Sequence, residues 1–253
     1  MPLSSGVSKL LVIDLTPCNT FIRSSSPTPT SEVPFLIDRK IGDGVYKQVF
    51  SVIFSQTGKT KAISIVKCLN DETLAAVLNG IWMSQIFCDC PYILPVTAYE
   101  HDPASQMIYT LTEECTQGTF TQRFAKAPLE QILGWIDQLE EALQALRDKG
   151  LSHGDLKGEN VLITENQIRV IDLDWAVPQQ RSLRFFPLDH DLDALHEMVL
   201  KLAEARWGDD QIPQTIEDRL QAIKKRALDC AAPPTRSCNE FYDFAALELP
   251  EEL

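Results

Sequence analysis

The chain has 253 residues, 44% of them hydrophobic, which suits one domain of two lobes, or two small domains, with a real core. Its formal net charge of −13 argues against a nucleic-acid partner, because phosphate contacts need clustered Lys and Arg. The longest apolar runs fall far short of the ~20 residues that cross a bilayer, so we expect no membrane insertion and a soluble, cytoplasmic protein. The oligomeric state stays open.

The first 34 residues are expected to form an N-terminal extension and a flexible linker. Residues 8–15 are apolar enough to make one strand, which we expect to dock on the domain that follows. Residues 24–34 hold three prolines and little that could be buried, a composition typical of flexible linkers. The seven cysteines are odd in number and lack a C-x-x-C pair, which favours reduced thiols over a zinc site or a disulfide framework.

Strand-forming residues begin at Phe35 and continue to residue 54, interrupted by Gly42-Asp43-Gly44. Val, Ile and Phe flank these glycines, so the sequence predicts a hairpin. A further strand is predicted at residues 62–67, where the apolar run ends in Lys67.

Two helices are predicted from apolar residues at three- and four-residue spacing. The first covers residues 71–87. The second begins at Pro128, which suits the first position of a helix, and ends at Gly150.

The most informative stretch follows the second helix directly and reads His153-Gly154-Asp155-Leu156-Lys157-Gly158-Glu159-Asn160. An apolar segment, Val161-Leu162-Ile163, comes next, and Asp172 follows a second one. A polar turn between helix and strand could hold such residues by chance. The polar positions and both apolar segments together, however, resemble the H-R-D-L-K-x-x-N catalytic loop and the D-F-G motif of eukaryotic-type protein kinases.

This resemblance implies an α+β, two-lobed, protein-kinase-like fold. The N-lobe, at about residues 35–113, would hold a small antiparallel sheet and one helix, and the mainly helical C-lobe would follow at about residues 114–253. The implied function is Mg-ATP-dependent phosphoryl transfer to a Ser or Thr hydroxyl of a protein substrate, since Lys157 two residues after Asp155 is similar to Ser/Thr kinases. ATP and Mg²⁺ are the expected cofactors.

The resemblance also implies a role for each polar residue of the motif. Asp155 would face the acceptor hydroxyl, and Lys157 would neutralise the phosphate in flight. Asn160 and Asp172 would supply oxygen ligands to Mg²⁺, which prefers oxygen at about 2.0–2.1 Å. Asp191, further along, is expected to brace the backbone of the loop, to cap a helix, or to do both.

The expected nucleotide-binding positions follow from the same resemblance. The glycine hairpin is similar to the family's phosphate-covering loop, and Lys67 to the lysine that holds the α- and β-phosphates. Backbone groups of residues 113–115 would meet adenine. The full expected set is Gly42, Gly44, Val49, Ile65, Lys67, Glu113, Cys115 and Leu162.

Four departures from the family pattern keep alternatives open. Asn79 stands where the family has a glutamate that pairs with the strand lysine, and Lys47 replaces the third glycine of the hairpin. Ile65 replaces a smaller alanine beside adenine, and Asp174 replaces the glycine of D-F-G. A pseudokinase acting as a nucleotide-binding or scaffold module is therefore the main alternative. No A-P-E motif follows, which also leaves a small-molecule kinase open.

Overall fold

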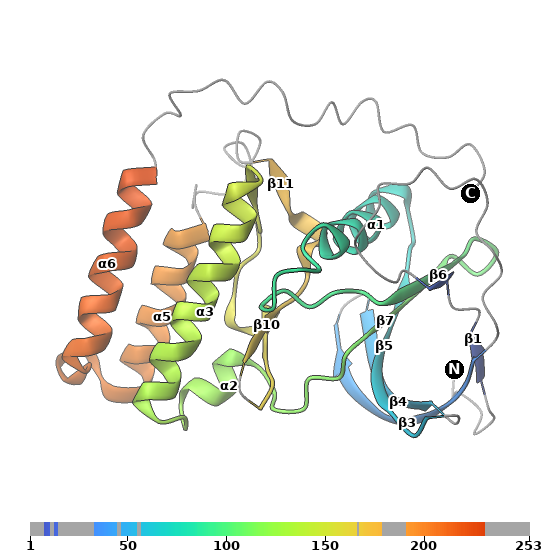
Figure 1. Cartoon of the computed structure of the whole chain (residues 1–253), viewed down its shortest axis with the longest axis horizontal. Helices are drawn as coiled ribbons and strands as arrows, with labels where there is room; N and C mark the ends of the chain where they lie inside the picture. The colour runs from blue at the N-terminus through green and yellow to red at the C-terminus, as the bar shows by residue number, and fades with distance from the viewer. Residues whose placement is uncertain are drawn as a thin grey trace.

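A β-sheet with one helix forms one lobe of the protein, and a group of helices forms the other (Figure 1). The predicted two-lobed α+β fold is therefore confirmed. Most of the expected linker, and the end of the expected C-lobe after residue 230, lie outside the described residues. The computed structural model describes residues 8–10, 13–14, 33–44, 47–54, 57–165, 167–178 and 191–230.

The sheet of the first lobe is antiparallel. Short strands from the N-terminal extension cover both of its edges, because β1 pairs with β3 and β2 pairs with β6. The sequence predicts one docking strand at residues 8–15, whereas the structure has these two. Across the sheet the order is β1 (Ser8–Leu10), β3 (Val33–Asp43), β4 (Lys47–Phe54), β5 (Thr60–Lys67), β7 (Met107–Thr112), β6 (Ala98–Asp102) and β2 (Ile13–Asp14).

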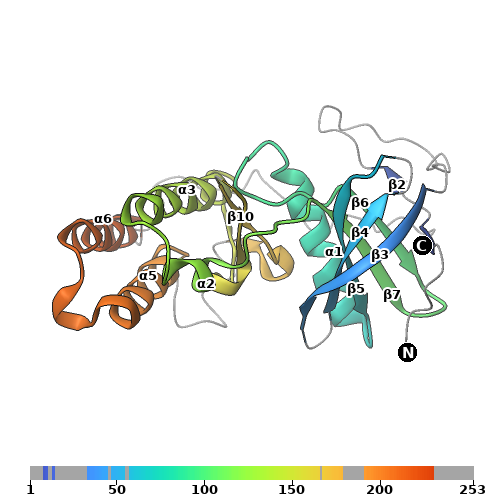
Figure 2. The ribbon, with the colours of Figure 1, turned by 90° about the horizontal axis from the view of Figure 1, so that it is seen from below.

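The two faces of the sheet have different partners. On the outer face, Val52 and Ile63 belong to a small apolar core. Helix α1 (Asp71–Ile86) lies on the other face (Figure 2). Its Ile81 packs in a core that includes Val66 of β5. Because successive side chains of a strand point to opposite faces, this packing decides which residues of β4 and β5 lie on the α1 side.

Local sequence signals explain where the long helices begin and end. The side-chain oxygen of Asn70 accepts a hydrogen bond from the backbone N–H of Thr73 (2.8 Å) and caps α1. Helix α3 (Leu129–Asp148) begins after Pro128 and ends shortly before Gly150, whose φ of 69° favours glycine. The predicted second helix is therefore confirmed.

The second lobe is built around α3, which contributes the fully buried side chains of Trp135 and Leu139 to the largest core. Arg219 and Arg226 of α6 form ion pairs with Glu140 of α3, so α6 is tied to the centre of the lobe. The other helical elements are α2 (Phe120–Phe124), α5 (Asp191–Trp207), the 3₁₀ turn η3 (Asp209–Gln211) and α6 (Gln214–Cys230).

Short strands and turns connect α3 to α5 and carry most of the motif residues. Strands β8 and β11 pair with each other, and β9 and β10 form a hairpin. These segments lie between the helices and the sheet (Figure 1). They are β8 (Leu151–Ser152), η1 (Gly158–Asn160), β9 (Val161–Ile163), β10 (Ile168–Val170), η2 (Leu173–Trp175) and β11 (Val177–Pro178).

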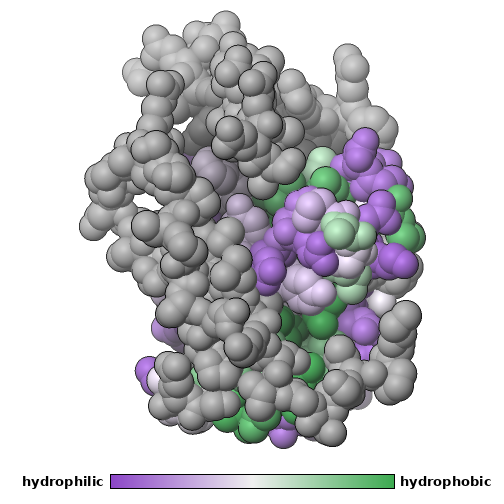
Figure 3. Space-filling view, turned by 90° about the vertical axis from the view of Figure 1, so that its right-hand side faces the viewer, coloured by the Kyte–Doolittle hydropathy of each residue, from purple (hydrophilic) through white to green (hydrophobic). Residues whose placement is uncertain are grey.

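The described surface at the sheet end of the molecule mixes hydrophilic and hydrophobic side chains (Figure 3). None of the helices in the described ranges is long and apolar enough to cross a membrane.

Three described cysteines, Cys68, Cys90 and Cys115, are free thiols, in line with the expectation of reduced cysteines. Cys88 is disulfide-bonded, which corrects that expectation for one residue. The irregular spacing of the cysteines gives no sign of this bond, because pairing depends on distance in the folded chain.

Candidate active site

The loop between β8 and η1 is held in place by the first residue of α5. The carboxylate of Asp191 accepts hydrogen bonds from the hydroxyl of Ser152 (2.9 Å) and from the backbone N–H of His153 (2.7 Å). The backbone N–H of Gly154 adds a longer contact of 3.4 Å. The expected bracing role of Asp191 is therefore confirmed.

His153 is fully buried and links this loop to the segment that follows β10. The backbone N–H of Asp155 donates to its Nδ1 (3.3 Å), and its Nε2 lies 3.0 Å from the carbonyl oxygen of Ile171. With Nδ1 as the acceptor, the proton is on Nε2, which donates to that carbonyl. His153 therefore fixes both Asp155 and the residue directly before Asp172.

The structure brings Asp155, Lys157 and Asn160 together. Nζ of Lys157 lies 2.5 Å from Oδ2 of Asp155, and the side-chain amide of Asn160 donates to the same oxygen (3.1 Å) and to the carbonyl oxygen of Asp155 (2.9 Å). Asn160 is only 6% exposed, whereas the Asp155 side chain is 34% exposed. The buried amide thus orients a carboxylate that a substrate can still reach.

Asp172 lies beside this group, at the turn after β10. The backbone N–H of Ile171 donates to the carbonyl oxygen of Asn160 (2.9 Å), which holds the start of the turn against the catalytic loop. Asp172 has a left-handed backbone, with φ 66° and ψ 53°. This conformation costs an L-residue roughly 1–2 kcal/mol, and such strain clusters at functional sites. Nζ of Lys47 lies 3.8 Å from Oδ1 of Asp172.

The β3–β4 hairpin supplies the glycines and Val49. Gly42 pairs with Val49 across the hairpin, and a Cβ on Gly42 would lie 3.3 Å from the Val49 side chain. The backbone N–H of Gly44 donates to the carbonyl oxygen of Lys47 (2.7 Å), which closes the turn. Lys47 therefore extends toward Asp172 from the position of the family's third glycine.

Ile65 and Lys67 do not face Asp172, which corrects their expected places. Val66 lies between them and packs on α1, while Ile63 packs in the core of the outer face. Ile65 and Lys67 share the outer face with Ile63, because side chains alternate along β5. The residue of β5 that stands on the α1 side in this region is Ser64, a buried serine whose hydroxyl has no hydrogen-bond partner.

Helix α1 is fastened to η2 at the position of the family's missing glutamate. The side-chain amide of Asn79 donates to the carbonyl oxygens of Asp174 (3.1 Å) and Ala176 (3.0 Å). The neighbouring Gly80 lies so close to Asp174 that a Cβ there would be 1.9 Å from its Oδ1. Asn79 and Gly80 therefore hold the segment after Asp172 directly against the helix.

Asp174 adds a second carboxylate next to Asp172. Burial raises the pKa of Asp174 to about 6, although the positive charge of Lys47 opposes this rise; the negative charge of Asp172 adds to it. The two carboxylates thus form an acidic pair with Lys47 beside them.

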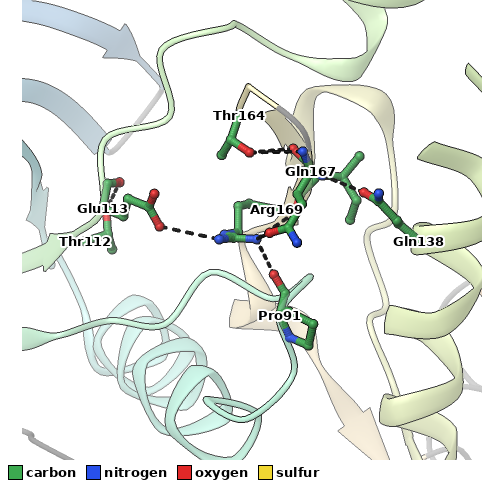
Figure 4. A network of polar contacts seen from close by, with 8 residues as sticks. Pro91, Thr112, Glu113, Gln138, Thr164, Gln167 and Arg169 are labelled. Atoms are coloured by element: carbon green, nitrogen blue, oxygen red, sulfur yellow. Dashed lines mark hydrogen bonds and ion pairs between the residues drawn. The ribbon is translucent and has the colours of Figure 1, made fainter. Parts of the chain in front are cut away.

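Arg169 of β10 anchors the connection between the lobes (Figure 4). Its guanidinium lies 3.6 Å from Oε2 of Glu113, donates to the side-chain oxygen of Gln167 (2.9 Å), and also donates to the carbonyl oxygen of Pro91. The contacts reach the connecting segment, the β9–β10 hairpin and the loop after α1. The hinge is therefore held by one positive charge from the C-lobe.

The hinge carries both charged and neutral side chains, since Glu113 is an exposed carboxylate and Cys115 is partly buried. Burial, reinforced by the charge of Glu113, raises the pKa of Cys115 to about 11, so its thiol stays protonated at neutral pH. Leu162 is partly exposed, because its neighbours Val161 and Ile163 turn into the C-lobe core. Glu113 and Cys115 are thus part of the hinge itself, and Leu162 lies on β9 of the C-lobe.

The residues present fit Mg²⁺ and ATP. Mg²⁺ is usually held by one or two carboxylates together with phosphate oxygens and water, and Asp172 with the side-chain oxygen of Asn160 can supply the protein's share. Across the described ranges, no group of three or more His, Cys, Asp or Glu could hold a metal. A metal at this site would therefore depend on the phosphates for its remaining ligands.

Sequence comparison agrees with this geometry, since a family profile described as the protein kinase domain matches residues 35–186. The chain belongs to the protein kinase family. Similar curated proteins include an Aurora kinase of Candida glabrata, 27% identical over 166 residues (63% of this chain, 46% of the relative). Serine/threonine-protein kinase 10 of Homo sapiens is 29% identical over 153 residues (57% and 15%), and serine/threonine-protein kinase ULK3 of Xenopus laevis is 28% identical over 139 residues (51% and 28%). The chain spans less than half the length of these relatives.

Sequence reasoning missed Ser64 and gave Lys47 no role in this kinase fold. The strand Ala62-Ile63-Ser64-Ile65-Val66-Lys67 fits the family's V-A-I-K strand in two registers, which place either Ser64 or Lys67 at the lysine. Only the packing of Val66 against α1 chooses between them. The sequence did hold one signal of a role for Lys47, since a charged residue stands there in place of the third hairpin glycine.

Proposed function

We propose that this protein is an active, Mg-ATP-dependent protein kinase that phosphorylates Ser or Thr. The observation that carries the proposal is the arrangement of Asp155: its carboxylate is oriented by Asn160, contacted by Lys157 and still accessible. A scaffold needs no such group. Kinases need one carboxylate to orient the acceptor hydroxyl and accept its proton.

The chain's own residues divide the work. Asp155 accepts the proton of the acceptor hydroxyl at Oδ1 or Oδ2, and Lys157, 2.5 Å from Oδ2, offsets the charge that builds up beside it. Asn160 and Asp172 would hold the metal, and backbone groups of the hinge would hold adenine, with Val49 and Leu162 as apolar neighbours. When Mg-ATP is bound, ATP supplies the phosphoryl group and Mg²⁺ offsets the negative charge of the phosphates.

The choice of Ser or Thr rests on Lys157 and on the relatives. Lys157 follows Asp155 by two residues, as in Ser/Thr kinases, and two of the similar proteins named above are serine/threonine kinases. A protein substrate is therefore the expected partner.

A pseudokinase is the second candidate, and the contact between α1 and η2 favours it. Asn79 is uncharged, so it cannot form an ion pair with a phosphate-holding lysine. Its side-chain amide instead donates hydrogen bonds to backbone carbonyl oxygens. In kinases that pair must be in place for catalysis. A scaffold held permanently in one conformation would tolerate this replacement.

A phosphate-transfer assay separates the two candidates. The full chain is incubated with γ-labelled Mg-ATP and a mixed protein substrate, and compared with Asp155→Asn. We expect the substitution to lower transfer to Ser and Thr about 10²- to 10⁴-fold, while nucleotide affinity changes little. Equal, background-level transfer by both proteins would support the pseudokinase. Transfer only to small hydroxyl compounds would point to a small-molecule kinase.

A further inference from the structure

We propose that Lys47, on the glycine-rich hairpin, is the residue that holds the nucleotide phosphates, in place of a lysine on strand β5. This proposal rests on the nucleotide use proposed above. It assigns a phosphate-binding role to a residue that stands where the family has the third glycine of the hairpin.

Only side chains on the α1 side of the sheet can reach phosphates bound beside Asp172. Register pairs Lys47 with Val66, Val49 with Ser64 and Ser51 with Ala62. Val66 packs on α1, so these paired residues lie on the α1 side of the sheet, as Lys47's approach to Asp172 also shows. Among the described positions of β4 and β5 on this side, Lys47 carries the only positive charge.

The position of Lys47 suits the task. Its Nζ lies 3.8 Å from the Asp172 carboxylate, next to the expected metal, and its side chain is 39% exposed, so the amine remains free to rearrange. A lysine is a compact charge on a flexible four-carbon stem and can reach a phosphate from more than one backbone position. Lys67, in contrast, lies on the outer face.

Ser64 supplies a second, independent observation. It is 6% exposed, its hydroxyl has no hydrogen-bond partner, and it stands opposite Val49 on the α1 side. A buried hydroxyl without a partner is destabilising, so a structural role alone does not explain a serine there. A small polar residue at this position leaves room for the Lys47 amine and the phosphates, and offers them a donor.

The decisive experiment compares two lysines with two ligands. Binding of Mg-ATP and of adenosine to the full chain is measured by calorimetric titration for the native protein, Lys47→Gln and Lys67→Gln. Each variant removes one positive charge from an exposed side chain. We expect Lys47→Gln to weaken Mg-ATP binding roughly tenfold to a hundredfold, as for one charge-assisted hydrogen bond, and to leave adenosine binding within about twofold. Lys67→Gln should leave both unchanged.

Further results would support or overturn the assignment. Lys47→Arg keeps the charge and should retain most of the Mg-ATP affinity, while ligand-free melting temperatures check that each variant is folded. If Lys67→Gln loses Mg-ATP affinity and Lys47→Gln does not, or if both lose it equally, the assignment is overturned and the proposed kinase function stands. If the native protein binds neither ligand, both proposals fail.

Discussion

The two halves of the cleft follow the kinase pattern to different degrees. The C-lobe half keeps Asp155, Lys157, Asn160 and Asp172. Hydrogen bonds join the first three, and the backbone bond from Ile171 to Asn160 ties the turn at Asp172 to them. The N-lobe half has Ser64 of β5 where the pattern has a lysine, because Val66 of that strand packs on α1. It has Asn79 of α1 where the pattern has a glutamate.

This difference has a physical reason. A carboxylate that orients a hydroxyl must be placed to within a fraction of an ångström, which ties it to one backbone position. A lysine acts on phosphates as a mobile point charge, so a neighbouring strand can supply it. The contact between α1 and η2 then depends on hydrogen bonds and close packing rather than on an ion pair.

Removing the brace of the C-lobe half should have the largest effect on stability. Asp191→Ala leaves the Ser152 hydroxyl and the His153 N–H without their acceptor, and each buried orphan donor costs about 1–3 kcal/mol. We expect the free energy of unfolding, measured by urea denaturation, to fall by about 3–5 kcal/mol. Asp193→Ala, in the same helical turn, is the control and should change it by less than about 1 kcal/mol. Equal losses of stability for the two variants would show that the hydrogen bonds of Asp191 do not stabilise the C-lobe half of the cleft.

The acidic pair should make the N-lobe contact dependent on pH. Burial raises the pKa of Asp174 from 3.8 to about 6, so the folded protein holds this proton more tightly than the unfolded chain does. The free energy of unfolding should therefore fall as pH rises from about 4 to 6 and then level off. One pKa unit corresponds to about 1.4 kcal/mol, so the total loss is roughly 3 kcal/mol at most.

Denaturation of the ligand-free protein across this pH range tests the contribution of Asp174. Asp174→Asn cannot ionise, so its stability should be flatter between pH 4 and 6 than that of the native protein. Matching profiles would show that Asp174 ionises at no cost, and that η2 is not held as tightly against α1 as the structure indicates.

Substitutions at two glycines test how closely α1 packs against η2. Gly80→Ala would place a Cβ 1.9 Å from Oδ1 of Asp174, whereas a Cβ on Gly134 of α3 meets nothing within 4 Å. We expect Gly80→Ala to lower the free energy of unfolding by about 1–3 kcal/mol, because the contact is overpacked. Gly134→Ala should raise it by about 0.5–1 kcal/mol through helix propensity. A gain in stability for both would mean that η2 can move away from the helix at little cost.

The sequence alone determined the C-lobe half of the site and the class of fold. The spacing from Asp155 to Asn160 is short and is followed by an apolar hairpin that ends at Asp172, so local chain geometry already brings these residues together. Helix α3 was predictable for a similar reason, since Pro128, the apolar stripe and Gly150 are local signals.

The tertiary structure decided the N-lobe half. Whether Ser64 or Lys67 faces the cleft depends on a one-residue alternation in β5, and both faces of that strand carry apolar residues. The packing of Val66 on α1 resolves it, and the pairing of β4 with β5 then brings Lys47 to Asp172. These are contacts between segments far apart in the chain, and no local pattern records them.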